Sequence, residues 1–266
     1  MTNRLTDPQS LVAKWAGRHA DKEALRHEIW AKLEQTSAAV GNPWHRIPVF
    51  VGGEKAAARL AELPIWINAR VLNCSPDTAQ APVRRRALEA GKLIYMPVPA
   101  LTHDDPFVLL DPQALQAQGV SPAEASFHAR AVEVGQKVRF EDMLPMDLVV
   151  TGCVAVTRQG GRTGKGAGFA DLEFGVLREY GLMTTATPIV TTVHPFQVVP
   201  NDRVIMQPHD SALHWIITPD EVIETHSPFP QPSGIDWERV QPDQYQDIPF
   251  LKHLREQRHR SSNSQD

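Results

Sequence analysis

The sequence has only two cysteines, Cys74 and Cys153, among its 266 residues. They lie far apart, each in or beside an apolar run, so they form neither a disulfide framework nor a zinc-ligand pattern. We expect two buried free thiols. No apolar stretch reaches the roughly 18 residues of a membrane-spanning helix. The first residues, Met1–Pro8, lack the apolar core of a signal peptide, so the sequence predicts a cytoplasmic protein with no membrane partner.

The sequence also lacks an excess of positive charge. Its 27 lysines and arginines are outnumbered by 31 acidic residues, and the net charge is -4. This balance argues against a nucleic-acid partner, which would favour a basic surface. Hydrophobic residues make up 42% and charged residues 22% of the chain, as is ordinary for a globular protein. The length allows one sizeable α/β domain with extensions.

Glycine is concentrated in one segment, where residues 160–168 contain five glycines and two cations, Arg162 and Lys165. An apolar run, residues 147–157, precedes it as one buried strand or a broken pair of strands. A segment with helical periodicity, residues 169–180, follows it. A glycine turn between strand and helix exposes backbone N–H groups, which suit phosphate. The pattern matches neither the Walker nor the dinucleotide motif, so a flexible loop without a ligand is the alternative.

Periodicity predicts alternating helices and strands along most of the chain. Helices are expected at 21–40, with Asp21 as N-cap, at 55–63, and at 81–90, closed by Gly91. Strands are expected at 66–74, 92–98 and 187–193, with a last strand at 214–218. A strand–helix–strand succession favours right-handed crossovers and a mainly parallel sheet.

Two segments interrupt this pattern. Prolines repeatedly break residues 98–145, which we interpret as an insertion carrying short helices, either a lid or a peripheral connector. Residues 227–266 form a polar, proline-containing tail that we expect to be partly disordered. The main domain is therefore predicted to cover residues 1–226.

The glycine segment resembles the signature of the 5-formyltetrahydrofolate cyclo-ligases (methenyltetrahydrofolate synthetases), Gly-x-Arg-Leu-Gly-x-Gly-x-Gly-Tyr-Tyr-Asp. Further blocks resemble this family in the same order: Lys22–Arg26, Met146–Val150, Thr192–Val199, Pro208–Asp210 and Trp215–Thr218. The departures lie in the folate half. Phe169 and Ala170 replace the paired tyrosines, Ala167 replaces a common cation, and Asn73–Asp77 stands near the family's glutamate segment. The chain looks like a diverged branch, similar to the methenyltetrahydrofolate synthetase domain proteins.

The resemblance implies a three-layer α/β sandwich around a mainly parallel sheet. It also implies ATP- and Mg²⁺-dependent conversion of 5-formyltetrahydrofolate to 5,10-methenyltetrahydrofolate. Arg162 and Lys165 would then act in catalysis and Phe169 would contact the folate substrate. Asp171 would hold Mg²⁺ or interact with the N-terminus of its own helix. The residues that would hold ATP are Lys22, Arg26, Gly161, Gly164, Gly166 and Gly168.

Several alternatives remain open. Lys22 and Arg26 lie four residues apart, so they share one helix face, which could equally be a solvated charged face. His209 and Asp210 fit a structural turn better than acid–base catalysis, because an aspartate after a proline commonly bonds the local backbone. Trp44, Phe169 or Phe196 could stack on a pterin ring. At the level of the protein, the alternative is a non-catalytic nucleotide- or folate-binding module of the same fold.

Overall fold

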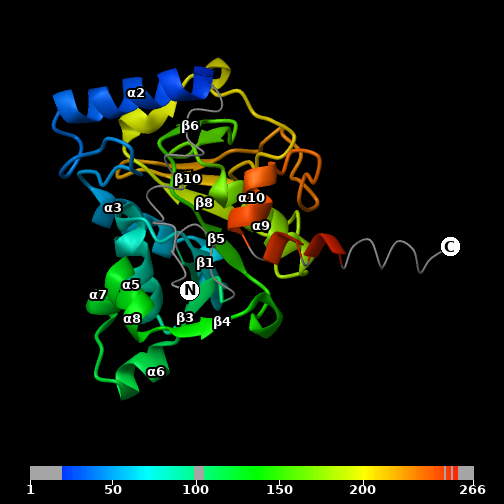
Figure 1. Ribbon diagram of the computed structural model, residues 1–266. Coiled ribbons are helices and arrows are strands. Elements are labelled where there is room, and N and C mark those ends of the chain that lie inside the picture. The colour runs from blue at the N-terminus through cyan, green and yellow to red at the C-terminus, as the bar shows by residue number, and fades with distance from the viewer. Residues whose placement is uncertain (1–19, 99–104, 249, 253, 257–266) are drawn as a thin grey trace, which may run out of the picture.

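The computed structural model describes residues 20–98, 105–248, 250–252 and 254–256 (Figure 1). An eight-stranded sheet runs through it in the order β11-β10-β8-β5-β1-β2-β3-β4. The strands are β1 (Val71–Cys74), β2 (Leu93–Pro97), β3 (Phe107–Leu110), β4 (Gln136–Val138), β5 (Leu148–Val150), β8 (Ile189–Thr192), β10 (Trp215–Ile217) and β11 (Val222–Glu224). The central strands from β10 to β2 are parallel, whereas β3, β4 and β11 pair antiparallel. The predicted α/β fold with a mainly parallel sheet is confirmed.

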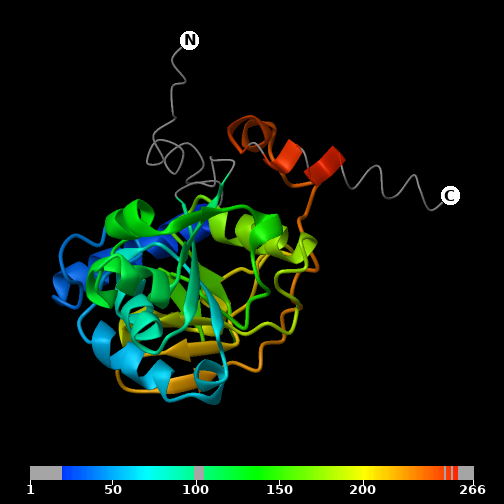
Figure 2. The same ribbon diagram turned by 90° about the horizontal axis from the view of Figure 1, so that it is seen from below.

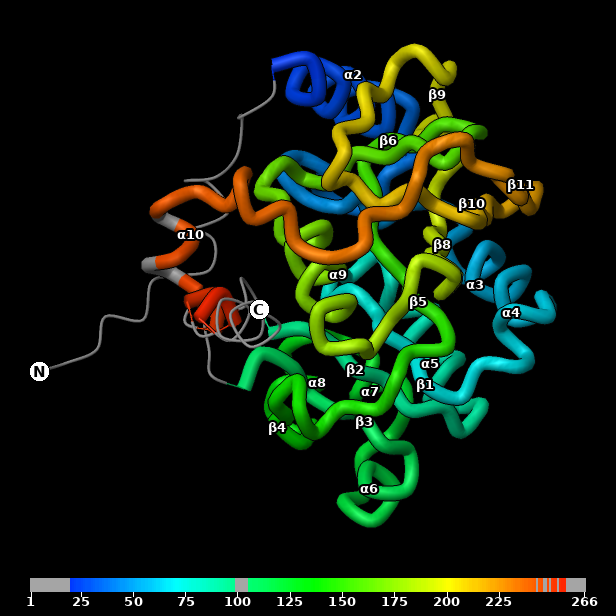
Figure 3. The backbone as a smooth tube through the Cα atoms, turned by 90° about the vertical axis from the view of Figure 1, so that its right-hand side faces the viewer, coloured from blue at the N-terminus to red at the C-terminus, as the bar shows by residue number. Residues whose placement is uncertain are grey.

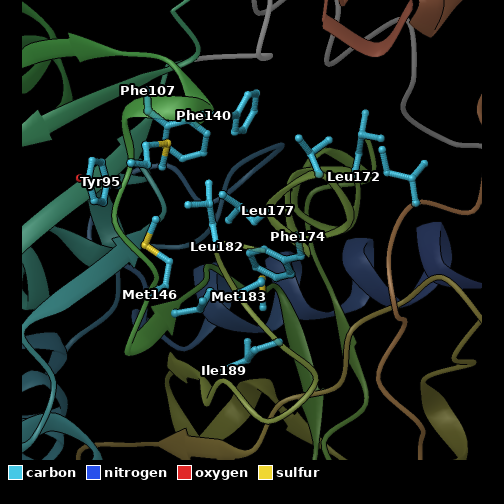
Figure 4. Close-up of a cluster of buried hydrophobic side chains, with 14 of the residues drawn as sticks. Tyr95, Phe107, Phe140, Met146, Leu172, Phe174, Leu177, Leu182, Met183 and Ile189 are labelled. Carbon is cyan, nitrogen blue, oxygen red and sulfur yellow. The ribbon is translucent and has the colours of Figure 1, made fainter. Parts of the chain in front are cut away.

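Helices cover both faces of this sheet. One face carries α3 (Gly53–Ala61), α5 (Ala81–Glu89), α6 (Pro112–Ala117), α7 (Pro122–Ala125) and α8 (His128–Val134), and the other carries α9 (Phe169–Glu179). Successive side chains of β1 point to opposite faces of the sheet, so Leu72 packs toward the first set of helices and Val71 toward α9. Figure 4 shows the cluster on the α9 side, where Phe174 and Leu177 lie close to Met183 and Leu182.

A smaller sheet lies beyond β5 and carries the first helix. It has the order β7-β6-β9, from β6 (Ala155–Thr157), β7 (Arg162–Thr163) and β9 (Val198–Val199). Helix α2 (Ala20–Gln35) packs on it through Leu25, Ile29 and Leu33, and crosses above β6 in Figure 1. The apolar run 147–157 is therefore the broken pair of strands, β5 and β6, and its two halves belong to different sheets.

Some predicted boundaries are wrong. The strand expected from 66 begins only at Val71, because a helical turn, α4 (Pro64–Ile67), precedes it with proline in its first position. Helix α2 ends at Gln35, where Ala38 N–H donates back to Leu33 O at 2.9 Å. Asp21 lies inside the first turn of α2 and is not its cap. The short helical turns elsewhere are η1 (Thr78–Gln80), η3 (Phe140–Asp142), η4 (Pro195–Gln197) and η5 (Asn201–Arg203).

Residues 105–145 add two strands to one edge of the central sheet, which the expected insertion with short helices did not include. Strand β3 pairs antiparallel with β2, and β4 pairs with β3. The expected short helices are present as α6, α7 and α8. The strands escaped prediction because each is short and is flanked by proline-rich or helical sequence.

The chain after β10 also differs from the expectation. Strand β11 follows the strand predicted to be last. The segment after β11 passes across α9 toward α10 (Pro242–Asp247), as Figures 2 and 3 show in orange. Trp237 Nε1 donates to Glu179 Oε1 at 3.2 Å, and Ile235 packs against Gly175 of α9. The last ten residues, 257–266, lie outside the described part of the chain. No described helix is long and apolar enough to span a membrane.

Candidate functional site

The strand order places a switch point between β1 and β5. From β1 the chain moves outward to β2, and it later returns beside β1 as β5 before moving the other way to β8 and β10. Ligands of open α/β sheets bind outside the carboxyl ends of strands at such a point. Ser75 and Asp77 follow β1 here, and Gly152 follows β5. Gly152 N–H donates to Ser75 Oγ at 3.3 Å, which joins the two strand ends.

The glycine segment reaches this point in two pieces, because the short strand β7 divides it. Gly160 and Gly161 form the turn from β6 to β7, and Gly164 to Gly168 lead into α9. Gly161 N–H already donates to Thr157 Oγ1 at 3.0 Å, so this amide is not free for an anion. By contrast, a side chain at Gly164 or Gly168 would meet only open space. The backbone at Gly164 and Gly168, next to the N-terminus of α9, therefore has open space beside it, and a helix N-terminus favours an anion there.

A basic side chain of α2, Arg26, contacts this second piece of the glycine loop. Arg26 of α2 is 2% exposed, and its Nη1 donates to Thr163 Oγ1 at 3.0 Å. Its guanidinium also covers Gly166, which has a φ of 113° and where any side chain would come within 3.4 Å of it. The interpretation of this helix face as solvated is thus wrong for Arg26. The structure brings α2 to the loop, and a role of Lys22 and Arg26 in nucleotide binding stays a prediction.

Each of these cations is already paired with a carboxylate of the same chain. Lys22 Nζ lies 2.5 Å from Asp210 Oδ2, and Lys165 Nζ lies 2.6 Å from Asp77 Oδ1. The two arginines of the site are paired as well, Arg26 with Glu23 and Arg162 with Asp171. An anionic ligand therefore has to compete with internal anions for every one of these four cations.

Arg162 and Asp171 form an interior pair at the exit of the loop. The Arg162 side chain is 3% exposed, and its Nε donates to Ser211 O at 2.7 Å. Asp171 Oδ1 accepts from Arg162 and from Ser211 N at 2.8 Å. Burial raises the pKa of Asp171, and the charge of Arg162 opposes that rise. Asp171 therefore ties β7 and the Ser211 segment to α9. A role for Asp171 in holding Mg²⁺ stays a prediction.

The sequence analysis missed a buried acid–amide pair beneath the loop. Glu173 of α9 is 7% exposed, and Asn73 Nδ2 of β1 donates to its Oε1 at 2.6 Å. Burial raises the pKa of Glu173 to about 7. Asn73 Oδ1 accepts no hydrogen bond from the residues that the structure describes. An asparagine inside an apolar strand, on the same face as Val71, was the signal that could have revealed this pair.

Asp210 and His194, near the last strands, accept hydrogen bonds from the local backbone. Asp210 Oδ2 accepts from Gln207 N at 2.8 Å, so the predicted structural turn at His209–Asp210 is confirmed. His194 Nδ1 accepts from Phe196 N at 3.2 Å and caps η4. Phe169 is the half-buried first residue of α9 and packs against the core cluster on that side.

The described cysteines are buried, and the described histidine, cysteine and acidic side chains do not gather in groups of three that could hold a metal ion. Cys74 and Cys153 are buried free thiols, as predicted, and burial raises the pKa of Cys74 to about 11. Within the described ranges, no three histidine, cysteine or acidic side chains come together as a metal site. A magnesium ion held mainly by phosphate oxygens does not need such a cluster.

Comparison with known proteins identifies the family. Residues 18–219 match the 5-formyltetrahydrofolate cyclo-ligase family. The chain is 35% identical over 237 residues to a methenyltetrahydrofolate synthase domain-containing protein of Mus musculus, and 34% identical over 233 residues to one of Danio rerio. These alignments cover 88% and 87% of the chain but 63% and 60% of the two relatives. The chain therefore spans less than two thirds of their length.

A solved structure supports the fold independently. The 5,10-methenyltetrahydrofolate synthetase of Aquifex aeolicus aligns with 77% of this chain and 93% of its own, with a TM-score of 0.50. The two sequences are 16% identical, so this likeness supports the fold alone.

Proposed function

The chain belongs to the 5-formyltetrahydrofolate cyclo-ligase family, and we propose that it converts 5-formyltetrahydrofolate to 5,10-methenyltetrahydrofolate with ATP and Mg²⁺. The observation that carries the proposal is the contact of Arg26 with the open glycine loop beside the β1–β5 switch point, with Lys22 of the same helix held at the neighbouring Asp210 turn. Cations and free amides at a helix N-terminus are the chemistry that holds a polyphosphate.

The triphosphate would lie along the loop from Gly164 to Gly168. The open space at Gly164 and Gly168 leaves room for phosphate oxygens, and the N-terminus of α9 favours their charge. Lys165 would exchange Asp77 for a phosphate oxygen, and Lys22 would likewise leave Asp210. Arg26 already covers Gly166. It would hold the loop in place and also neutralise part of the negative charge of the ligand.

Mg²⁺ fits the site as an ion shared between nucleotide and protein. It prefers oxygen ligands and usually keeps one or two protein carboxylates together with substrate phosphates. Asp171 Oδ1 is engaged by Arg162 and Ser211, so this residue would offer its other oxygen. When bound, the metal would neutralise charge on the transferring phosphoryl group.

In the proposed reaction, the formyl oxygen receives the phosphoryl group, the neighbouring amine attacks the activated carbon, and phosphate leaves as the ring closes. Such transfer asks a protein mainly for positioning and charge neutralisation. Lys165 and the loop amides would supply the charge, and Phe169 at the start of α9 would contact the folate. Arg162 would act by orienting Asp171 and the loop exit, since its guanidinium is buried among protein partners.

The second candidate is a non-catalytic nucleotide- or folate-binding module of the same fold. It is favoured by Phe169 and Ala170 in place of the family tyrosines and by Asn73–Asp77 in place of the glutamate segment. Both candidates predict binding of nucleotide or folate, and only the enzyme predicts turnover. The buried free thiols of Cys74 and Cys153 fit the cytoplasmic setting that we propose for either.

One assay separates the two candidates. Purified protein receives 5-formyltetrahydrofolate with Mg·ATP, and the absorbance of methenyltetrahydrofolate is followed, with a reaction lacking ATP as the control. The enzyme proposal expects ATP-dependent product. Binding of nucleotide or folate without product would support the binding module instead, and failure to bind either ligand would refute both candidates.

A further inference from the structure

A group of aromatic rings lies next to the phosphate-binding end of α2. His27 of α2 and Trp44 have ring centroids 5.7 Å apart, and His27 and His45 are 6.3 Å apart. All three rings surround Trp30, whose centroid lies 5.9 Å from Trp44 and 5.4 Å from His45. We call His27, Trp44 and His45 the aromatic platform.

The platform is open to solvent, whereas the ring beneath it is not. Trp30 is 1% exposed, and its Nε1 donates to Arg46 O at 3.0 Å. The His27 side chain is 51% exposed, His45 is exposed and Trp44 is half-buried. Trp30 belongs to the buried core at this place, and the outer rings keep exposed surface that a flat ligand can cover.

The backbone holds the platform in place. His45 has a φ of 59°, a left-handed conformation that residues other than glycine adopt rarely. Trp44 N–H donates to Asn42 Oδ1 at 2.9 Å, which fixes the turn that carries both rings. The rings therefore come from a defined turn against α2.

One carboxylate connects the platform to the cations of the site. Glu23 Oε2 bonds the Arg26 guanidinium, and Glu23 Oε1 lies 3.2 Å from His27 Nε2. Arg26 in turn covers Gly166 of the glycine loop. Glu23 thus links the guanidinium that covers the loop to the first ring of the platform, which is the order in which a nucleotide presents phosphates and base.

We propose that the aromatic platform stacks the base of the nucleotide whose phosphates bind the glycine loop, an inference that rests on the proposed function. Stacking suits any base, because every base presents a π-face to an aromatic ring. Trp44 provides the stacking face, and His27, whose ring stands at 69° to that of Trp44, contacts the edge of the base. The occupant is the base of ATP, the nucleotide of the proposed function, and the adjoining cations favour its polyphosphate.

The test compares two ligands that share phosphates but not a base. Mg·ATP and inorganic tripolyphosphate with Mg²⁺ are titrated into the parent and into Trp44→Leu. We expect Trp44→Leu to weaken ATP binding by about 10-fold and to leave tripolyphosphate binding unchanged. Trp44→Phe retains a stacking ring and should restore most of the ATP affinity. Phe229→Leu removes a half-buried ring in the C-terminal segment and serves as the matched control.

Each outcome decides the matter. If Trp44→Leu keeps full ATP affinity, or loses ATP and tripolyphosphate equally, the platform does not hold a base. If Phe229→Leu weakens ATP as much as Trp44→Leu does, the effect is one of stability and the proposal is overturned. If the parent binds neither ligand, the nucleotide site itself fails, and the platform fails with it.

Discussion

At the scale of single residues, burial decides what the charged groups can do. Arg162 was expected to act in catalysis from its place in the glycine segment, yet its guanidinium bonds Asp171 and Ser211 inside the protein. Glu173, which no motif contains, is the acid whose environment is most unusual, because it is buried against Asn73. The two residues lead to one prediction each.

Arg162→Ala is expected to destabilise the fold as well as any activity. Removing one member of a buried ion pair leaves the other charge uncompensated, which costs about 3–5 kcal/mol. Chemical denaturation should show this loss in the free energy of unfolding. The double variant Arg162→Ala/Asp171→Asn should recover part of it, because it removes the stranded carboxylate. If Arg162→Ala alone were as stable as the parent, the ion pair would contribute nothing to the free energy of unfolding.

Glu173 should make stability depend on pH in a defined window. Its pKa is raised from an ordinary value of 4.5 to about 7 in the folded protein, so between these values the folded state holds a proton that the unfolded state has released. Stability from this group is complete below the unfolded pKa and is lost as the pH rises toward about 7, by at most about 1.4 kcal/mol per pH unit.

The variant Glu173→Gln should remove that dependence. Its amide can both accept from Asn73 Nδ2 and donate to Asn73 Oδ1, which has no donor among the described residues. Urea unfolding of parent and variant at pH 5, 6, 7 and 8 measures the difference, with the exposed Glu133→Gln as the control. Equal slopes for parent and Glu173→Gln would show that this carboxyl has no raised pKa.

At the scale of elements, the site is assembled by contacts between segments distant in sequence. Lys22 of α2 reaches the Asp210 turn, and Lys165 of the glycine loop reaches Asp77 after β1. These ion pairs hold α2, the loop and the end of β1 together before any ligand binds. They also oppose a phosphate, because the same ammonium groups must be released.

Asp77→Asn is therefore expected to strengthen ATP binding, by about 5-fold for a partly exposed pair. The variant removes the internal competitor for Lys165 while keeping its shape. Titration of Mg·ATP gives the affinity, and the double-mutant cycle with Lys165→Ala identifies the cause. In the Lys165→Ala background the gain should vanish. If the gain in ATP affinity persists in the Lys165→Ala background, the negative charge of Asp77 repels the nucleotide directly and does not act through Lys165.

At the scale of the whole molecule, ligand binding should stabilise the fold, because the site draws on α2, β7, α9 and the end of β1 together. A ligand at 100-fold its dissociation constant adds about 2.7 kcal/mol to the free energy of unfolding. For a chain of this size we expect Mg·ATP to raise the Tm by about 5–10 °C. A melting scan at millimolar nucleotide measures the shift, with adenosine as a control that lacks phosphates. An unchanged Tm would refute the phosphate site.

Local sequence was sufficient for the type of most elements. The glycines around α9, the strand–helix–strand succession of β1, α5 and β2, and the left-handed Gly91 after α5 each follow from short-range rules. The same is true of the α/β class and of the family, whose signature is a contiguous run of residues. Short strands β3, β4 and β11 were missed, since only pairing with neighbours makes them strands.

The sequence by itself determined the fold class, the family and the segments that carry cations and glycines, because these depend on spacing along the chain. Only the tertiary structure decided what each charged group faces. It buried Arg162 with Asp171, opposed Lys165 with Asp77, and set Glu173 against Asn73. Partners separated by up to 100 residues in these pairs meet through packing of the sheet and its helices, and burial fixes both the strength of a charge and its access to a ligand.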